Sequence, residues 1–406
     1  MEGQEHIFMN RLRFSLNLYK SMLSRASKTD NLLVSPLSAE LAAVTAYTGA
    51  QGKTRTEIAE VLGLMADYTV ERISDWLAQM IRDETKELAF DENLEQWCRN
   101  FELSSCVGMF VDESVRVIER YTESAQNLVN AACLPVPFAS DPDGAWENVR
   151  AFITTPTKGK RPKILDSSKI TPPTNLVLAT TINFRSNWAE PFDENQTVKK
   201  WFTLASGAKI QVDTMHGTFT RLFQYHKSWR LHGAKILQLP YLRLCCKAYI
   251  ILPSKRTWYS CPLRKDRLRH LEDLLTPKRL LQELSKVDYP HVVYAEIPKF
   301  CLQHTMAVDK CLAEMGMTTA FSADADLSGI CTRSPLNISA VSQAAVFGFD
   351  ENGSGCGPVK VDQYMFMSTY PQSRVKFIAN RPFLFIVCHI ETNTILLMGR
   401  VCNPLT

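Results

Sequence analysis

Short apolar runs in the second half of the chain constrain its fold more than any other feature. From about residue 174 onward, β-branched and aromatic residues gather in runs bounded by turn residues, and several runs are apolar on both faces. Strands of that kind lie in the middle of sheets that are covered on both sides. The runs that predict strands are NLVLATTINFRSNW, KILQLPYLRLCCKAYIILP, YAEIPKF, ISAVSQAAVFGF, RPFLFIVCHI and TILLMGRV.

Helical patterns fill the first 160 residues. The stretch SPLSAELAAVTAYTGAQGKTRTEIAEVLGL predicts a helix with Ser38 as its N-cap, then a glycine turn and a second amphipathic helix. Residues 68–100 are acidic and predict a long helical insert. The 406 residues exceed the usual size of one domain, yet no low-complexity linker or internal repeat divides them. We therefore expect an α+β fold in a single domain, residues 1–406.

Charge and hydropathy exclude two classes of partner. Lys and Arg number 46 against 42 Asp and Glu, and a net charge of +4 is too small and too evenly spread for nucleic-acid binding. No window has the ~18 apolar residues of a membrane span. The N-terminus lacks the apolar core of a signal peptide and instead repeats apolar residues at helical spacing, at Phe8, Leu12, Leu16, Tyr19 and Leu23.

These features predict a soluble protein without a cleavable signal peptide. It is expected in the cytoplasm, or outside the cell or at its surface after unconventional export. Asn195, Asn337 and Asn352 begin glycosylation sequons, which we expect to be unmodified because no signal segment precedes them.

The twelve cysteines are irregularly spaced, and no two of them form a CxxC pair. That spacing excludes the commonest zinc arrangements. We expect most of the cysteines to be reduced core thiols and expect neither a metal nor another cofactor. Those that lie in apolar strand-like runs include Cys245, Cys246, Cys301 and Cys388.

Motifs of catalysis are weak throughout the chain. GAQGKT, residues 49–54, ends like a phosphate-binding loop, but Tyr47 stands where that loop needs its first glycine, and a helix rather than a strand precedes it. No GxSxG or HExxH motif occurs. We expect that the protein is not an enzyme.

A basic cluster, RKDRLRHLEDLL, occupies residues 264–275. A weak contact with a sulfated polysaccharide near Arg264–Arg269 is one interpretation. A solvated helix face is the plainer one, because Glu272 and Asp273 partly cancel the positive charge.

Residues 351–377, ENGSGCGPVKVDQYMFMSTYPQSRVKF, form a long segment between two strand-like runs. Its first part is glycine-rich and polar, and its later part is aromatic and β-prone. Loops of this length without secondary structure are uncommon in compact domains and are usually functional. The segment is therefore the first place to look for functional residues.

The chain resembles the serpins from about residue 10 to residue 404. The resemblance implies three β-sheets, about nine helices and an exposed reactive-centre loop, which falls at residues 351–377. The lack of a signal peptide is similar to the ovalbumin-type branch, and we expect a monomer. The stretches that carry the resemblance are, in order, NLLVSPLSAELAAVTAYTGAQGKT, KGKRPKILDSSKITPPTNLVLATTINFRSNWAEPFDENQT, LQLPYL, IILP, EIPKF, LAEMGMTTAFSADADLSGI and FIANRPFLFIVCHIETNTILLMGRVCNP.

The resemblance also implies a function. In serpins, a target serine protease attacks the loop and forms a covalent acyl-enzyme, and the freed loop inserts as a new central strand that drags and distorts the protease. A sheet that can gain one more hydrogen-bonded strand is not at its free-energy minimum, so it persists only behind a barrier. The expected function is suicide inhibition of a serine protease.

The expected reactive bond joins Met367 to Ser368. The hinge glutamate and glycine of the family match Glu351 and Gly353, and a reach of about seventeen residues from the glutamate, the length that strand insertion needs, ends at Met367. The stretch YMFM, which ends at Met367, suits a chymotrypsin-like or elastase-like protease.

Two alternatives for the attacked residue stay open. Phe366 is a neighbour of the same apolar kind. Arg374 would attract a trypsin-like protease, and the segment after Ser368 is a few residues longer than usual, which leaves room for cleavage further along.

The hinge departs from the family's run of alanines and threonine. Pro358 offers no N–H to a central strand. Burying Lys360 without a partner costs several kcal/mol, against about 1 kcal/mol gained per backbone hydrogen bond. Strict alternation would place on the inward face Ser354, Cys356, Pro358, Lys360 and Asp362.

Two arrangements would relieve this cost. Lys360 and Asp362 lie two apart on one face and could pair. Alternatively, a one-residue bulge at Gly355 or Gly357 would turn Val359 and Val361 inward. If neither occurs, the alternative function is a non-inhibitory serpin that acts as a binding, carrier or decoy protein.

The resemblance extends to the region where the central strands part. Ser35 and Ser38 match two serines of the family, while Thr180 and Gln343 stand at its asparagine and histidine positions. Threonine and glutamine can form a neutral donor–acceptor pair there. Trp188 occupies the position under the entry of the loop, and ordinary core packing is its alternative role.

Overall fold

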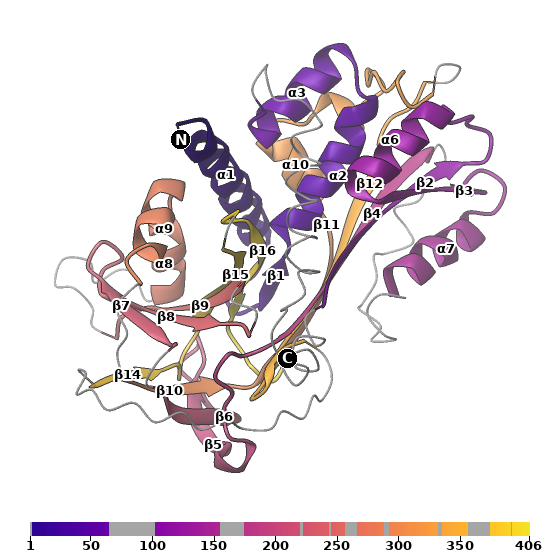
Figure 1. The fold of residues 1–406 in the computed structure, drawn as a ribbon. Helices are drawn as coiled ribbons and strands as arrows, with labels where there is room; N and C mark the ends of the chain where they lie inside the picture. The colour runs from indigo at the N-terminus through magenta and orange to yellow at the C-terminus, as the bar shows by residue number, and fades with distance from the viewer. Residues whose placement is uncertain are drawn as a thin grey trace, which may run out of the picture.

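The computed structural model describes residues 2–64, 102–154, 174–219, 222–242, 245–255, 266–287, 292–331, 335–355, 374–390 and 392–406. In this part of the chain, eight α-helices surround three β-sheets (Figure 1). The predicted α+β class is therefore confirmed, whereas the predicted insert at 68–100 lies outside the described residues. The helices are α1 (Glu2–Arg25), α2 (Pro36–Gly49), α3 (Gly52–Leu62), α6 (Glu119–Val129), α7 (Pro142–Thr154), α8 (Arg267–Leu274), α9 (Pro277–Leu284) and α10 (Asp309–Met315).

The largest feature is a six-stranded sheet whose strand order is β11-β12-β13-β4-β2-β3. It runs obliquely through the molecule, with α7 against one face (Figure 1). β12 and β4 pair in parallel, and β2 continues the sheet beside β4 in the antiparallel sense. The strands are β2 (Glu102–Asp112), β3 (Ala131–Val136), β4 (Leu176–Asn187), β11 (Phe300–Ala307), β12 (Ala340–Phe349) and the two-residue β13 (Gly353–Ser354).

Two further sheets complete the fold. The second has the order β1-β16-β15-β9-β8-β7, and the third has the order β14-β10-β6-β5. The second consists of β1 (Leu32–Val34), β7 (Gln224–Ser228), β8 (Ala234–Pro240), β9 (Cys246–Leu252), β15 (Phe383–His389) and β16 (Ile395–Val401). The third consists of β5 (Val198–Thr203), β6 (Lys209–Phe219), β10 (Val292–Pro298) and β14 (Arg374–Ile378).

The apolar runs of the sequence form the central strands, as predicted. Every residue of β15 and β16 is buried, and β12 is buried apart from its half-buried first residue. These strands are covered on both faces, which explains why they are apolar throughout rather than alternating.

Helix α2 lies between sheets and is buried nearly all round. It packs against β2, β4 and β12 of the large sheet and against β16 of the second sheet. The prediction that Ser38 caps this helix is wrong, because the N-cap is Ser35, whose Oγ accepts a hydrogen bond from the Ser38 N–H at 3.1 Å. Pro36 follows the cap, and proline suits the first helical position because it has no N–H to satisfy.

The N-terminal segment forms α1, as its helical spacing predicted. Leu12, Leu16, Tyr19 and Leu23 are buried, so the helix docks along one face. No helix among the described residues combines the length and the apolar character needed to cross a membrane. The nine cysteines in this part of the chain form no disulfide.

Candidate functional site

The short strand β13 enters the large sheet between its two central strands. β12 and β4 pair directly from Ala340 opposite Val177 to Val346 opposite Asn183. Beyond that point they part, and Ser354 pairs with Phe349 of β12 on one side and Ser186 of β4 on the other. β13 runs antiparallel to both neighbours. The chain after Asp350 has therefore already begun a new central strand at one end of the sheet.

Glu351, the predicted hinge residue, is held by contacts from two other segments. Its carboxylate accepts hydrogen bonds from Thr197 Oγ1 at 2.6 Å and pairs with Lys299 Nζ at 2.7 Å. Its carbonyl accepts the Phe192 N–H at 2.9 Å. Burial alone would raise the pKa of Glu351, but the bonds from Lys299 and Thr197 outweigh it and hold the pKa below its usual value.

A tight turn connects β12 to β13. Asp350 Oδ1 accepts the N–H groups of Asn352 at 3.0 Å and Gly353 at 3.1 Å. Burial is the main effect on Asp350 and raises the pKa of its carboxyl group. Asn352, the sequon residue of the hinge, donates from Nδ2 to Glu194 Oε1 at 2.7 Å. The turn is thus ordered by its own side chains.

Trp188 lies beneath this turn and contacts two of its residues. Its Nε1 donates to the Asp350 carbonyl and its backbone N–H to the Asn352 carbonyl, each at 2.9 Å. Its ring stacks on Tyr241 with centroids 4.5 Å apart. The Tyr241 hydroxyl lies 2.6 Å from Ser354 Oγ. Trp188 is fully buried core and at the same time a hydrogen-bond donor to the hinge.

Two glycines allow the entry of β13. A Cβ atom built on Gly353 would lie 2.1 Å from the Ser186 carbonyl oxygen, so only glycine fits between the strands. Gly355 has φ +135°, a conformation that side chains rarely adopt, and its N–H still bonds to the Gly348 carbonyl at 3.0 Å. Ser354, between them, is buried.

Lower in the sheet, Gln343 ties β12 to the start of α2. Its Oε1 accepts the Ser35 N–H at 3.0 Å, and its Nε2 donates to the Ser35 carbonyl at 2.6 Å. Thr180 is the register partner of Gln343, but its Oγ1 donates to the Ser342 carbonyl at 3.4 Å. The glutamine therefore bonds with the backbone of Ser35 and not with the threonine side chain that the sequence suggested as its partner.

Of the two predicted serines, Ser35 has the fuller set of bonds. Its Oγ donates to the Leu396 carbonyl at 2.7 Å and caps α2. Ser38 Oγ is buried without a hydrogen-bond partner in the described part of the chain. The direct pairing of β12 with β4 at Gln343 and Thr180 is what a lengthening β13 would have to separate.

Several predicted site residues lie outside the described residues. These are the reactive-bond candidates Met367, Ser368 and Phe366, and the hinge positions Cys356, Pro358 and Lys360. The remaining candidate, Arg374, begins β14 and is paired in register with Val292 of β10.

Only part of the predicted basic cluster is described. Arg264 and Lys265 lie outside the described residues, whereas Arg267 and Arg269 belong to α8. Arg269 Nε pairs with Asp273 at 3.6 Å, and its Nη1 donates to the Leu23 carbonyl at 3.3 Å.

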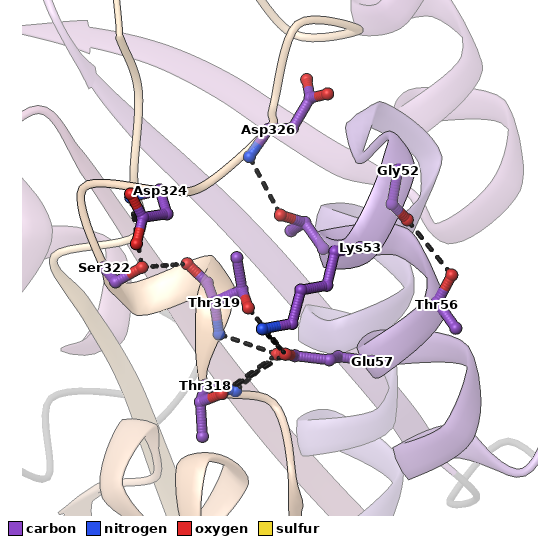
Figure 2. A network of polar contacts seen from close by, with 10 residues as sticks. Gly52, Lys53, Thr56, Glu57, Thr318, Thr319, Ser322, Asp324 and Asp326 are labelled. Atoms are coloured by element: carbon purple, nitrogen blue, oxygen red, sulfur yellow. Dashed lines mark hydrogen bonds and ion pairs between the residues drawn. The ribbon is translucent and has the colours of Figure 1, made fainter.

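The GAQGKT stretch contacts the chain itself, as Figure 2 shows. Lys53 pairs with Glu57 at 3.6 Å, and Glu57 accepts the N–H groups of Thr318 at 2.9 Å and Thr319 at 2.7 Å. Thr54 Oγ1 accepts the Asp326 N–H at 2.9 Å. Since α2 precedes α3 here, the prediction of a helix rather than a strand upstream is confirmed.

Sequence reasoning missed three residues that hold the hinge: Thr197, Tyr241 and Lys299. Thr197 and Lys299 stand in the stretches DENQT and EIPKF, which the resemblance had already marked. Neither residue type signals a hinge contact by itself, because each lies more than 50 residues before Glu351.

Comparisons with known proteins give the family of the chain. The family model described as serpin (serine protease inhibitor) matches residues 9–404. Alpha-1-antitrypsin of Sus scrofa is 27% identical over 391 residues, which cover 96% of this chain and 85% of that protein.

Solved structures give the same fold. Human thyroxine-binding globulin complexed with thyroxine has a TM-score of 0.78 at 22% identity, covering 98% of both chains. Native protease nexin-1 with heparin has a TM-score of 0.79 at 20% identity, covering 98% of this chain and 99% of that one. With a family model that spans nearly the whole sequence, three sheets and a hinge strand entering the largest of them, the chain belongs to the serpin family.

Proposed function

We propose that the protein inhibits a serine protease by offering its loop as a substrate. The serine Oγ of the protease attacks the carbonyl carbon of Met367, the bond to Ser368 breaks, and the amine leaves on Ser368. An acyl-enzyme remains on Met367. The freed loop then continues β13 down the large sheet and carries the attached protease with it.

The observation that carries this proposal is the position of β13. Gly353 and Ser354 already lie between the ends of β12 and β4, antiparallel to both. A strand that extends from Ser354 would separate β12 from β4 where these two strands now pair directly. It would gain hydrogen bonds to both of them. Inhibition at the level of the family is supported by the relatives named as antitrypsins.

Met367 is favoured over Arg374 as the attacked residue. A protease binds its substrate as an extended segment that is free of other strand pairing. Arg374 is already paired with Val292 in the third sheet, so its backbone would first have to leave β14.

The conformation of Gly355 supports a change of register in the hinge. A positive φ at glycine is typical of a bulge, in which one extra residue is accommodated and the next side chains change face. Such a change after Ser354 would turn Val359 and Val361 inward and leave Lys360 at the surface. The cost of burying Lys360 would then disappear.

Reaction with model proteases tests the proposal. The protein is mixed separately with chymotrypsin, elastase and trypsin, and the products are run on a denaturing gel. We expect an SDS-resistant complex with chymotrypsin or elastase and a released C-terminal peptide that begins at Ser368 by mass spectrometry. Proteases whose active serine is blocked beforehand are the control and form no complex. Loop cleavage without any stable complex would contradict the proposal.

A non-inhibitory binding protein is the second candidate, and Pro358 with Lys360 favours it. Thyroxine-binding globulin, solved with thyroxine, is a protein of this fold whose name describes ligand binding. In that case cleavage of the loop would leave the melting temperature of this protein unchanged.

A sulfated-polysaccharide contact near Arg264–Arg269 stays a finer prediction, and a monomer with no enzymatic activity is part of the same proposal. The nexin-1 structure with heparin is consistent with polysaccharide binding on this fold. One observation speaks against polysaccharide binding here. Arg269 already pairs with Asp273 and donates to the Leu23 carbonyl, so it is not part of a row of cations that are available to a ligand.

A further inference from the structure

A cleft of about 1030 Å³ opens beside α8, away from the hinge residues. Its walls come from five places in the chain: the segment after α1, the turn between β5 and β6, the segment after β9, helix α8 with its N-cap, and the turn between β14 and β15. Residues from these places that matter for its chemistry include Leu204, Lys255, Arg267, Leu268 and Arg381. The volume is at the upper end of the range for sites that hold small organic molecules.

The cleft carries more positive charge than its acidic groups neutralise. Lys28, Lys255, Arg267, Arg269 and Arg381 line it, together with Asp266 and Asp273. Asp266 Oδ1 is engaged as the N-cap of α8, where it accepts the Arg269 N–H at 2.9 Å. Asp273 pairs with Arg269 at 3.6 Å. In the described ranges, no carboxylate pairs with Lys28, Lys255, Arg267 or Arg381.

Arg381 is fixed in the wall of the cleft by neutral acceptors. Its Nε and Nη2 donate to the Pro253 carbonyl, the first at 3.0 Å, and its Nη1 donates to Asn380 Oδ1 at 3.3 Å. Burial, followed by the charge of Arg267, lowers the pKa of Arg381 to about 10. The Pro253 carbonyl and the Asn380 amide therefore fix the guanidinium of Arg381 without neutralising its positive charge.

Neighbouring cations lower the pKa values of one another. Lys235 lies next to this group, and its Nζ donates to the Lys376 carbonyl at 2.7 Å. Burial lowers its pKa, and the charges of Arg381, Lys227 and Lys255 lower it further. A bound anion would relieve this mutual repulsion, whereas a neutral or cationic ligand would not.

Apolar residues form part of the remaining wall, beside polar ones such as Thr203, Ser206 and Asn380. Leu204, Ala205, Pro253, Leu268 and Pro382 face the same space as the cations. We propose that the cleft binds a small organic anion with an apolar body, whose acidic group is held between Arg267, Lys255 and Arg381. This site lies outside the hinge and the reactive loop, so the inference does not depend on protease inhibition.

A small anion fits the cleft better than a polysaccharide does. A sulfated chain is bound best by an extended row of exposed cations that follows its charges. Here the cations surround a concave space with apolar walls, and Arg269 is already engaged by Asp273 and Leu23. Binding of a polysaccharide through the same residues is the competing outcome of the test.

Fluorescence titration with a matched pair of probes tests the inference. One probe is 8-anilinonaphthalene-1-sulfonate, and the other is N-phenyl-1-naphthylamine, which has the same rings without the sulfonate. The whole protein should bind the sulfonate at one saturable site, and the double variant Arg267→Ala with Lys255→Ala should bind it at least about tenfold more weakly. Both side chains are exposed, so the fold should be kept, and melting curves check this.

Three controls make the outcome decisive. Arg120→Ala removes an exposed arginine of α6 and should leave sulfonate binding unchanged. Arg267→Lys with wild-type Lys255 should keep most of the affinity, because it keeps the charge. The neutral probe should bind wild type and the double variant equally. Equal binding of the sulfonate to wild type and the double variant would overturn the inference.

Competition with a short heparin oligosaccharide identifies the class of ligand. If the cleft is built for a small anion, the oligosaccharide displaces the sulfonate only weakly and retains its own affinity in the double variant. If instead the oligosaccharide binds more tightly than the sulfonate, and the double variant binds the oligosaccharide weakly, the cleft is a polysaccharide site and the inference is wrong.

Discussion

Lys299 Nζ lies 2.7 Å from Glu351 Oε2, which ties the hinge to the short link between β10 and β11. The Glu351 side chain is only 5% exposed, whereas that of Lys299 is 41% exposed. The carboxylate is therefore almost removed from water and relies on Lys299 and Thr197 for its charge compensation. Because β13 follows three residues of turn, this ion pair fixes the point from which the loop enters the sheet.

Replacement of Lys299 by methionine should destabilise the intact protein. The buried carboxylate of Glu351 would lose a charge-assisted bond, worth about 1–2 kcal/mol after allowance for the partial exposure of Lys299. Denaturant unfolding measures the change. Lys209→Met, which removes an exposed lysine of β6, is the control.

The effect of Lys299→Met should depend on pH. Because the folded-state pKa of Glu351 is lowered, the stability from its ionised form is present above the ordinary glutamate pKa and is lost as pH falls through the folded value. The difference between Lys299→Met and wild type should therefore shrink in acid. Equal stability of Lys299→Met and Lys209→Met at neutral pH would show that the ion pair does not hold the hinge.

A single methyl group on Gly353 should expel β13 from the sheet. The added Cβ would lie 2.1 Å from the Ser186 carbonyl and 2.8 Å from Asn187 Cα, and both are backbone atoms that cannot turn aside. We expect Gly353→Ala to lose about 1–3 kcal/mol of stability. Limited proteolysis should then cut near residue 353, where the wild-type chain is buried.

Gly207→Ala is the matched control for this change. Nothing lies within 4 Å of the added methyl group, so it reports only the cost of the backbone angle, φ +91°. If Gly353→Ala resisted proteolysis as wild type does, β13 would not be a strand wedged between β12 and β4.

The register of the inserting hinge can be read from two substitutions. If the bulge at Gly355 turns Val359 inward, Val359→Asp places a charge in the core of the inserted strand and should abolish the SDS-resistant complex. Lys360→Ala should then have little effect, because Lys360 stays at the surface. The opposite pattern, with improved inhibition in Lys360→Ala and normal inhibition in Val359→Asp, would show that strict alternation holds.

A buried glutamate should make stability fall as pH rises toward neutrality. Glu272 accepts the Tyr19 hydroxyl at 2.7 Å and lies 3.6 Å from Arg400 Nη1, yet burial raises its pKa to about 7. A raised carboxyl pKa favours folding at pH below the unfolded value near 4.5, and this contribution is lost as pH approaches 7, at about 1.4 kcal/mol per unit.

Glu272→Gln removes this titration and still accepts from Tyr19. The difference in unfolding midpoint between wild type and Glu272→Gln should therefore change steadily from pH 5 to about pH 7 and level off above it, because the titrations shared by the two proteins cancel. Parallel midpoints over that range would mean that Glu272 keeps an ordinary pKa.

The sequence could identify what depends on local pattern. Runs such as ISAVSQAAVFGF are apolar on both faces because sheets and helices cover them, so β12 and its neighbours were predictable. The position of the α2 cap was not predictable from pattern alone, because Ser35 and Ser38 are both good N-cap residues. Only the proline between them decides which of the two caps the helix. Pro36 must stand at the first helical position, which makes Ser35 the cap.

Long-range contacts were beyond the sequence for a different reason. The sequence suggested Thr180 as the partner of Gln343, but an amide can bond with any group in reach, and in the structure Gln343 bonds with the backbone of Ser35. Lys299 stands 52 positions before Glu351, and no local pattern links a lysine to a carboxylate at that separation.

The central claim is that the intact protein stores free energy which entry of the loop into the large sheet releases. The direct measurement compares the melting temperature of the intact protein with that of protein cut once after Met367. We predict a rise of tens of degrees on cleavage, because a new strand hydrogen-bonded on both sides adds many contacts to the sheet. An unchanged melting temperature in the cut protein would contradict the account.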